Sequence, residues 1–192
     1  MNILAPFALL IGMLALVPAV PPSEPNVTRV MESLVRINGE NAAGEAFFCT
    51  GFVADLAGRV VTARHCVPEN GKFMVEGKPS YVIKQDAWIS IVGGGEGKKP
   101  LQFAKKLPSF LEKVWAFGNA FDWGYIALER SVAGFYDTEA KHIDISVNAP
   151  VGPGMSGGPI VNAANEVIAI NQMTTNATGI GCEAKAIQAL LR

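Results

Sequence analysis

Frequent turn residues divide the chain into short apolar runs, and this feature restricts the fold more than any other. Gly occurs 20 times and Pro 12 times in 192 residues. Most runs have the length of strands rather than helices. Twelve of them read as strands, in two groups of six on either side of the Gly-rich segment 93–100. The first group is 34–38, 46–54, 59–63, 72–76, 81–84 and 88–92, and the second is 114–117, 125–132, 143–147, 159–161, 167–172 and 179–183.

This pattern predicts an all-β fold of two small β-barrels that pack face to face. The barrels should span about residues 30–92 and 101–184. An apolar-periodic segment, Ala184–Leu191, predicts a short C-terminal helix, and a short helical stretch is expected from Asn26.

The N-terminal segment is different in character. Residues 3–20 are almost entirely apolar, and no Lys or Arg occurs before Arg29. The segment is long enough to cross a bilayer, and Val17 and Ala19 fit a signal-peptidase site. We therefore expect residues 1–20 to be a signal peptide or a membrane anchor, residues 21–29 a Pro-rich linker, and residues 30–192 the folded domain. Both alternatives place that domain outside the cytoplasm, as a secreted, periplasmic or membrane-anchored protein.

The charge of the chain excludes one class of partner. The formal net charge is −1, and the Lys pairs at 98–99 and 105–106 are isolated. Nucleic-acid binding needs a basic patch or stripe, so we expect no nucleic-acid partner.

Residues 152–159 read Gly-Pro-Gly-Met-Ser-Gly-Gly-Pro, with candidate strands on both sides. Glycines permit backbone conformations that a Cβ forbids, so that backbone N–H groups can turn toward one point. Fixed N–H donors of this kind form the oxyanion hole of acyl-transfer enzymes. Ser156 is therefore a candidate nucleophile, although a Gly/Pro-rich turn with an incidental serine has the same composition.

A serine hydroxyl needs an adjacent base to become a good nucleophile. His65 follows the candidate strand 59–63 in the stretch Val-Thr-Ala-Arg-His-Cys, residues 61–66. The other histidine, His142, lies beside Lys141 with no such context and is interpreted as structural or exposed. His65 is therefore the candidate general base.

The two stretches together resemble the signatures of the trypsin/chymotrypsin-like serine proteases, T-A-x-H-C and G-x-S-G-G-P. Residues 114–121, 147–154, 166–171 and 179–181 are also similar to segments of the HtrA-type proteases, so the resemblance covers nearly all of residues 30–190. It implies two six-stranded antiparallel β-barrels and a compact HtrA-type or viral-type member, without a PDZ domain in these residues. It further implies that the N–H groups of Gly154 and Ser156 form the oxyanion hole.

The resemblance also implies a third catalytic residue, an acid between His65 and Ser156. Asp86 begins an apolar alternating strand in a manner similar to the family pattern, although Trp88 stands where a small residue is usual. Glu76 is the alternative. Asp55 lies in an expected hairpin loop, and Asp122 and Asp137 lie in the second barrel, where this architecture does not place the acid.

In the family, cysteines at the positions of Cys49 and Cys66 form a disulfide beneath the catalytic histidine. The resemblance therefore implies this bridge, with Cys182 as the odd thiol. The cysteines lack zinc-site spacing, so we expect neither metal nor cofactor.

By resemblance, the substrate pocket contains Pro150, Val151, Ile170, Asn171, Gln172 and Gly181. None of these residues is charged, which predicts cleavage after neutral residues, because a buried cationic side chain without a partner is costly. Met155 replaces the aspartate that pairs with the new N-terminus in activated zymogens, so this kind of activation is not expected.

The resulting hypothesis is an exported serine endopeptidase, expected to be a monomer, that acts on protein or peptide substrates through His65, Asp86 and Ser156. Two alternatives stay open. One is a catalytically silent binding or scaffold module with the same fold. The other is a tethered processing protease for one partner or polyprotein, held at the membrane by residues 3–20.

Overall fold

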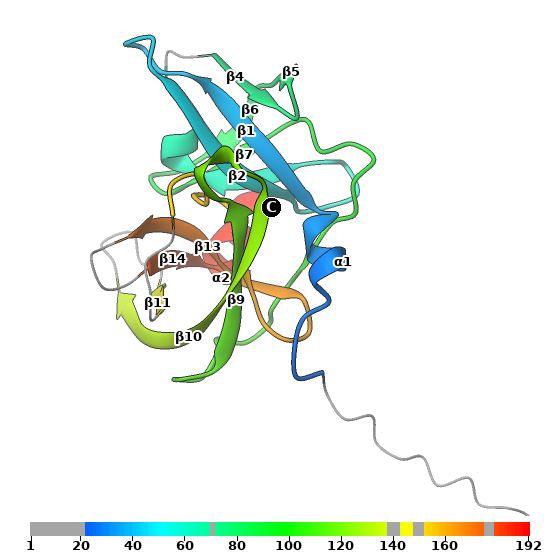
Figure 1. The fold of residues 1–192 in the computed structure, drawn as a ribbon, viewed down its shortest axis with the longest axis vertical. Helices are drawn as coiled ribbons and strands as arrows, with labels where there is room; N and C mark the ends of the chain where they lie inside the picture. Colours follow the sequence, from blue (N-terminus) through cyan, green and yellow to red (C-terminus); the bar gives the residue numbers. More distant parts are fainter. Residues whose placement is uncertain (1–21, 70–71, 138–142, 148–151, 175–178) are drawn as a thin grey trace, which may run out of the picture.

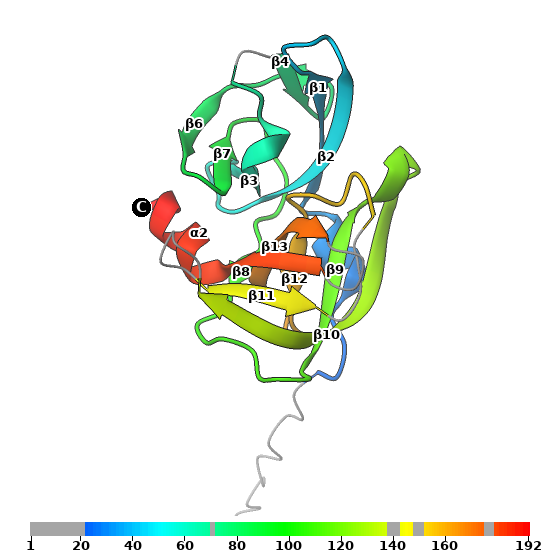
Figure 2. The ribbon, with the colours of Figure 1, turned by 90° about the vertical axis from the view of Figure 1, so that its left-hand side faces the viewer.

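The computed structural model describes residues 22–69, 72–137, 143–147, 152–174 and 179–192, which form two β-sheets with little helix (Figures 1 and 2). The first half of the chain builds the upper sheet of Figure 1 and the second half the lower sheet. The predicted all-β fold in two halves is confirmed.

The first sheet is antiparallel and has seven strands in the order β5-β4-β1-β2-β3-β7-β6. Its strands are β1 (Leu34–Glu40), β2 (Ala46–Val53), β3 (Val60–Ala63), β4 (Lys72–Val75), β5 (Lys78–Pro79), β6 (Val82–Gln85) and β7 (Ile89–Val92). Ser80 joins the two ends of this sheet. Its N–H donates to Phe73 O in β4 (3.2 Å), and its hydroxyl donates to Gly93 O just after β7 (2.9 Å). The sheet is thereby curled into a barrel.

The second sheet has the order β12-β9-β10-β11-β14-β13-β8, and β12 also pairs with β13, so that six strands form a closed ring. Its strands are β8 (Gln102–Phe103), β9 (Lys113–Asn119), β10 (Tyr125–Asp137), β11 (Ile143–Val147), β12 (Pro159–Val161), β13 (Glu166–Thr174) and β14 (Gly179–Glu183).

Two strands of the structure were not predicted. β5 and β8 contain two residues each, which is too short for an alternating pattern to be visible in the sequence. β10 also continues to Asp137 beyond the predicted end at Val132, because a bulge between Val132 and Gly134 lets its pairing with β11 resume.

Both predicted helices are present. α1 (Val27–Met31) begins at Asn26, whose side-chain oxygen accepts the N–H of Arg29 as an N-cap (3.0 Å). α2 (Ala184–Leu191) has the predicted bounds, and its Ile187 is fully buried. Among the described residues, no helix is long and apolar enough to cross a membrane. The apolar segment 3–20 lies outside the described residues.

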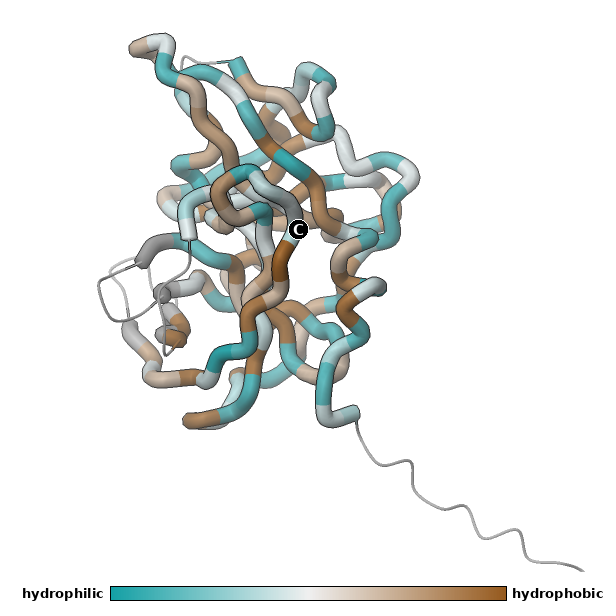
Figure 3. Tube along the Cα trace, viewed as in Figure 1, coloured by the Kyte–Doolittle hydropathy of each residue, from teal (hydrophilic) through white to brown (hydrophobic). Residues whose placement is uncertain are grey.

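The largest apolar cluster lies between the two barrels. Phe52, Ile89 and Ile91 of the first barrel meet Trp115, Phe117 and Ile170 of the second, and all are nearly or fully buried. Each barrel also has a core of its own. In Figure 3, hydrophobic and hydrophilic residues alternate along several strands, as expected when one face of a strand is buried. The shared core fixes the barrels against each other, so loops from both can build one site.

Candidate active site

Residues 152–158, here called the serine loop, connect the second barrel's strands at the junction of the barrels. Gly154 and Gly157 have φ angles of +87° and +80°, which side-chain-bearing residues rarely adopt. A Cβ on Gly157 would lie 2.1 Å from Thr62 Oγ1 and 2.3 Å from Thr50 O. Glycine is therefore required here for close approach to the first barrel.

The hydrogen bonds of the serine loop leave two N–H groups available. Met155 N–H donates to Gly152 O (3.2 Å), Gly157 N–H to Asn171 O in β13 (2.7 Å), and Gly158 N–H to Met155 O (3.0 Å). Within the described part of the chain, the N–H groups of Gly154 and Ser156 have no acceptor. They are the two donors that the sequence predicts for the oxyanion hole.

Thr50 of β2 holds the serine loop from the first barrel. Its N–H donates to Ser156 O (2.9 Å), and its hydroxyl donates to Gly154 O (2.7 Å) while accepting the N–H of Asn119 (2.8 Å). Thr50 is fully buried. No sequence pattern pointed to it, because its partners are 69 and 104 residues away.

Met155 anchors the serine loop in the second barrel. Its side chain is fully buried in that barrel's core. A Cβ on Gly118 would lie 2.7 Å from Met155 Cα, so the loop lies directly on β9. Apolar packing of the Met155 side chain therefore holds the residue directly before Ser156 in place.

His65 lies in η1 (Arg64–Cys66), a 3₁₀ turn that directly follows β3. The predicted Cys49–Cys66 disulfide is confirmed and joins this turn to β2, and Cys182 is buried outside it. A ring nitrogen of His65 and the two sulfur atoms all lie within 4.8 Å of one another. The ring therefore rests against the disulfide, whose bonded sulfurs, unlike thiolates, are not good metal ligands.

The serine loop and η1, here called the histidine turn, meet at the disulfide, where Cys66 Sγ lies 3.7 Å from Ser156 O. His65 is exposed overall, but the surrounding protein removes enough water from the imidazole to lower its pKa. No hydrogen bond joins His65 to Ser156 in the described structure. The disulfide thus brings the two residues to one region of the molecule.

Asp86 lies just before β7, where its side chain closes a turn. Oδ1 accepts the N–H groups of Trp88 (2.8 Å) and Ile89 (2.7 Å), and the residue is exposed. Within the described residues, no hydrogen bond connects it to His65.

Where the pairing of β3 with β7 ends, Trp88 lies opposite the histidine turn. β3 pairs with β7 so that Ala63 faces Ile89, and the following Arg64 N–H donates to Trp88 O (2.8 Å). Gln172 Nε2 also donates to this carbonyl (2.6 Å). Arg64, His65, Ala87, Trp88 and Gln172 line a cleft of about 420 Å³. Desolvation accounts for the lowered pKa of His65, with no opposing charge from a carboxylate among the described residues.

The alternative acid, Glu76, is bound elsewhere. Its carboxylate accepts the N–H of Arg36 (2.7 Å) and the hydroxyl of Tyr125 (3.2 Å), and it lies 3.8 Å from Lys98 Nζ. Burial, followed by the charge of Glu76, raises the pKa of that tyrosine. Asp55 pairs with Arg59 in the β2–β3 hairpin, where the sequence predicted a loop. His142 lies outside the described residues.

The predicted pocket residues are partly described. Pro150 and Val151 lie outside the described residues. Ile170 is fully buried in the core between the barrels, and Asn171 is buried with its side-chain amide on Phe117 O (3.1 Å). Gly181 is packed between Ile170 O and the side chain of Ile160. Gln172 is the predicted pocket residue that lines the cleft beside His65.

Comparison with known proteins identifies the family of the chain. Residues 49–170, more than half of the chain, match the family model of the trypsin-like peptidase domain. No curated protein sequence matches the chain significantly.

Solved structures share the fold at low sequence identity. The Rv3671c protease from M. tuberculosis in its active form superposes with a TM-score of 0.76 at 21% identity, covering 99% of this chain and 93% of that one. The HtrA-type protease AlgW with a tripeptide has a TM-score of 0.74 at 16% identity, and the serine endoprotease from Yersinia pestis 0.72 at 15%. These two matches cover 86% of this chain but only 60% and 63% of the longer proteins. On the evidence of the family model and of the two-sheet fold, the chain belongs to the trypsin-like peptidases.

Proposed function

We propose that this domain is a serine endopeptidase in which Ser156 is the nucleophile and His65 the general base. The observation that carries the proposal is the hydrogen bonding of the serine loop. The N–H groups of residues 155, 157 and 158 are used internally, while those of Gly154 and Ser156 are left without an acceptor. Unpaired N–H groups held in a rigid loop suit an oxyanion that forms only during reaction.

The proposed reaction has two halves. Ser156 Oγ attacks the substrate carbonyl carbon while His65 takes the hydroxyl proton, and the carbonyl oxygen becomes an oxyanion facing the two N–H groups. The C–N bond then breaks, His65 gives its proton to the leaving amine, and an acyl-enzyme remains. Water attacks the acyl-enzyme by the same route in reverse, which releases the acid product and restores Ser156.

Asp86 is the proposed orienting acid. It lies two residues before Trp88, whose carbonyl is bonded to the turn that carries His65. The two N–H groups of its own turn both bind Oδ1, so Oδ2 accepts no hydrogen bond within the described residues and is the oxygen proposed to orient His65. This is compatible with the general observation that catalytic hydrogen bonds tighten only when substrate is bound.

The proposed substrate is a protein or peptide with a neutral residue before the cut bond, since the described pocket residues carry no charge. Export from the cytoplasm is supported by the Cys49–Cys66 disulfide, because such bonds persist in oxidising compartments. The proposal includes a monomeric state. Residues 1–20 act in it either as a cleaved signal peptide or as a retained membrane anchor, and a retained anchor would suit the processing of a single partner.

The test is covalent labelling with a fluorophosphonate probe, which reacts with activated serine hydroxyls. Wild-type protein should be labelled at Ser156, as shown by peptide mapping, and Ser156→Ala should not be labelled. His65→Ala should be labelled several orders of magnitude more slowly. Wild-type labelling no faster than that of Ser156→Ala would exclude the proposed activity.

One observation favours a second candidate, a silent binding module. A tryptophan carbonyl rather than a carboxylate faces the histidine turn, and His65 has no acid partner within the described residues. This candidate predicts that the wild-type protein is folded but is not labelled. The wild-type protein and Ser156→Ala should then bind peptides of a library equally well.

A further inference from the structure

The short helix η2 (Ala120–Asp122), which follows β9, contains two unusual backbone conformations. Phe121 and Asp122 have φ angles of +53° and +59°. Non-glycine residues are strained in this region, so neighbouring contacts must hold the turn. The bonds of Asp122 therefore matter to the shape of η2.

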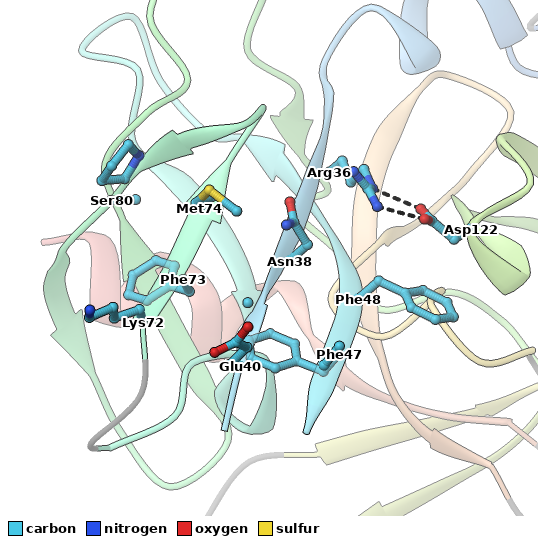
Figure 4. A pocket seen from close by; sticks show the side chains of 13 residues that line it. Arg36, Asn38, Glu40, Phe47, Phe48, Lys72, Phe73, Met74, Ser80 and Asp122 are labelled. Atoms are coloured by element: carbon cyan, nitrogen blue, oxygen red, sulfur yellow. Dashed lines mark hydrogen bonds and ion pairs between the residues drawn. The ribbon is translucent and has the colours of Figure 1, made fainter. Parts of the chain in front are cut away.

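Asp122 is held from both barrels. Its carboxylate receives two bonds from the guanidinium of Arg36, from Nε (2.7 Å) and from Nη2 (2.5 Å), and a third from Asn119 Nδ2 (2.9 Å). Arg36 belongs to β1 of the first barrel. Figure 4 shows this pair on the wall of a pocket of about 690 Å³, on the same side as Phe48. A two-bond arginine–carboxylate pair fixes orientation as well as distance.

η2 in turn holds the serine loop. Phe121 N–H donates to Pro153 O (2.8 Å), and a Cβ on Gly152 would lie 3.1 Å from the Phe121 ring. Pro153 O and the Gly154 N–H belong to the same peptide group. In a planar trans peptide the C=O and N–H point in opposite directions. The bond from Phe121 therefore fixes where the Gly154 N–H points.

We propose that Arg36 and Asp122 are positioning residues that aim the Gly154 N–H into the oxyanion hole through η2. The pair acts from outside the site and touches no reacting atom. The inference rests on the proposed peptidase function for its catalytic meaning, but the orientation of the Gly154 N–H is a property of the folded protein alone.

A purely stabilising role is a poor explanation of this pair. Both side chains are substantially exposed, at 45% and 33% of their surface. Water and salt screen an exposed ion pair, which limits its contribution to folding even when two bonds fix its geometry. The pair should therefore affect turnover much more than the free energy of unfolding.

The test is a graded series at position 122. Asn tolerates the left-handed backbone and keeps Oδ1, so Asp122→Asn removes the charge, whereas Asp122→Ala removes all three bonds. Loss of one oxyanion donor costs about 10²–10³ in turnover, so a misdirected donor should lower kcat about tenfold or more in Asp122→Ala, with a smaller loss in Asp122→Asn. KM should stay within about threefold, because the oxyanion contact strengthens in the transition state.

Lys99→Gln is the matched control. Lys99 pairs with Glu32 at 2.8 Å and is also exposed, at 65% of its side-chain surface. This variant should leave kcat and fluorophosphonate labelling unchanged. Raising the salt concentration should slow labelling of the wild type toward that of Asp122→Asn and have little effect on Asp122→Ala, because salt screens the ion pair.

A readout independent of activity separates this inference from the proposed function. In glycine-labelled protein, the amide NMR signal of Gly154 should shift in Asp122→Ala and stay in place in Lys99→Gln. If Asp122→Ala is labelled as fast as a labelled wild-type protein, or if the Gly154 signal does not move, the positioning role is wrong. A moved Gly154 signal without any wild-type labelling would support the positioning role and remove the peptidase function.

Discussion

At the scale of single residues, Asp86 offers the sharpest test of the catalytic assignment. Its turn depends on Oδ1 accepting the N–H groups of Trp88 and Ile89, and an asparagine Oδ1 can accept both. Asp86→Asn should therefore leave the unfolding midpoint unchanged. If the carboxylate orients His65, kcat should fall by roughly 10⁴, because the imidazole then takes the wrong tautomer. Steady-state kinetics decide this. Unchanged turnover would show that His65 works without a carboxylate, and Glu76→Gln then tests the alternative acid.

His65 also predicts a pH dependence. Desolvation lowers its pKa in the folded protein, and the ring must be neutral to accept the proton of Ser156. The rate of labelling should therefore rise with pH through an apparent pKa below the ordinary value of about 6.5. In the window between these two values the unfolded chain binds more protons, so stability should also rise with pH, and His65→Gln should flatten that slope. An apparent pKa above 6.5 would point to a carboxylate beside the ring.

At the scale of elements, the disulfide joins β2 to the turn that carries His65. In the chain-entropy model, opening a loop of 17 residues costs about 3 kcal/mol. The Cys49→Ala/Cys66→Ala double variant should lose about this much unfolding free energy in denaturant titrations. It should also be labelled more slowly at temperatures where it is still folded, since the His65 ring loses the surface on which it rests. Cys182→Ala is the control and should not alter labelling.

The elements also show what the sequence can and cannot predict. Strand alternation located nearly all strands, and glycine spacing identified the Ser156 loop, because these signals are local. Which residue faces the histidine turn depends on the register of β7 against β3, and a shift of two residues decides between Asp86 and Trp88. Thr50, Arg36 and Asp122 act through partners far away in the sequence. The resemblance concerns Asp122 only as a possible triad member, and the ion pair of Asp122 with Arg36 depends on contacts between barrels that no local sequence pattern shows.

At the scale of the whole molecule, Thr50 of the first barrel binds the serine loop of the second barrel through its N–H and its hydroxyl. Thr50→Val keeps the shape but leaves the Asn119 N–H and Gly154 O without their partner. It should cost about 1–3 kcal/mol of unfolding free energy and also slow labelling of Ser156. Ser33→Ala is the control, because its buried hydroxyl donates to Lys99 O, away from the serine loop. Equal loss of labelling in both variants would show a general effect of stability.

The bonds of Thr50 to Gly154 and Ser156 have a consequence for synthesis of the protein. The first barrel leaves the ribosome before residues 152–158 exist, and domains generally fold in that order. The serine loop receives its supporting bonds only when the second barrel docks on the finished first one. A chain that has only just exposed Ser156 therefore lacks the bonds of Thr50 to the serine loop until the second barrel docks. Under the proposed peptidase function, activity should appear only after both barrels have assembled.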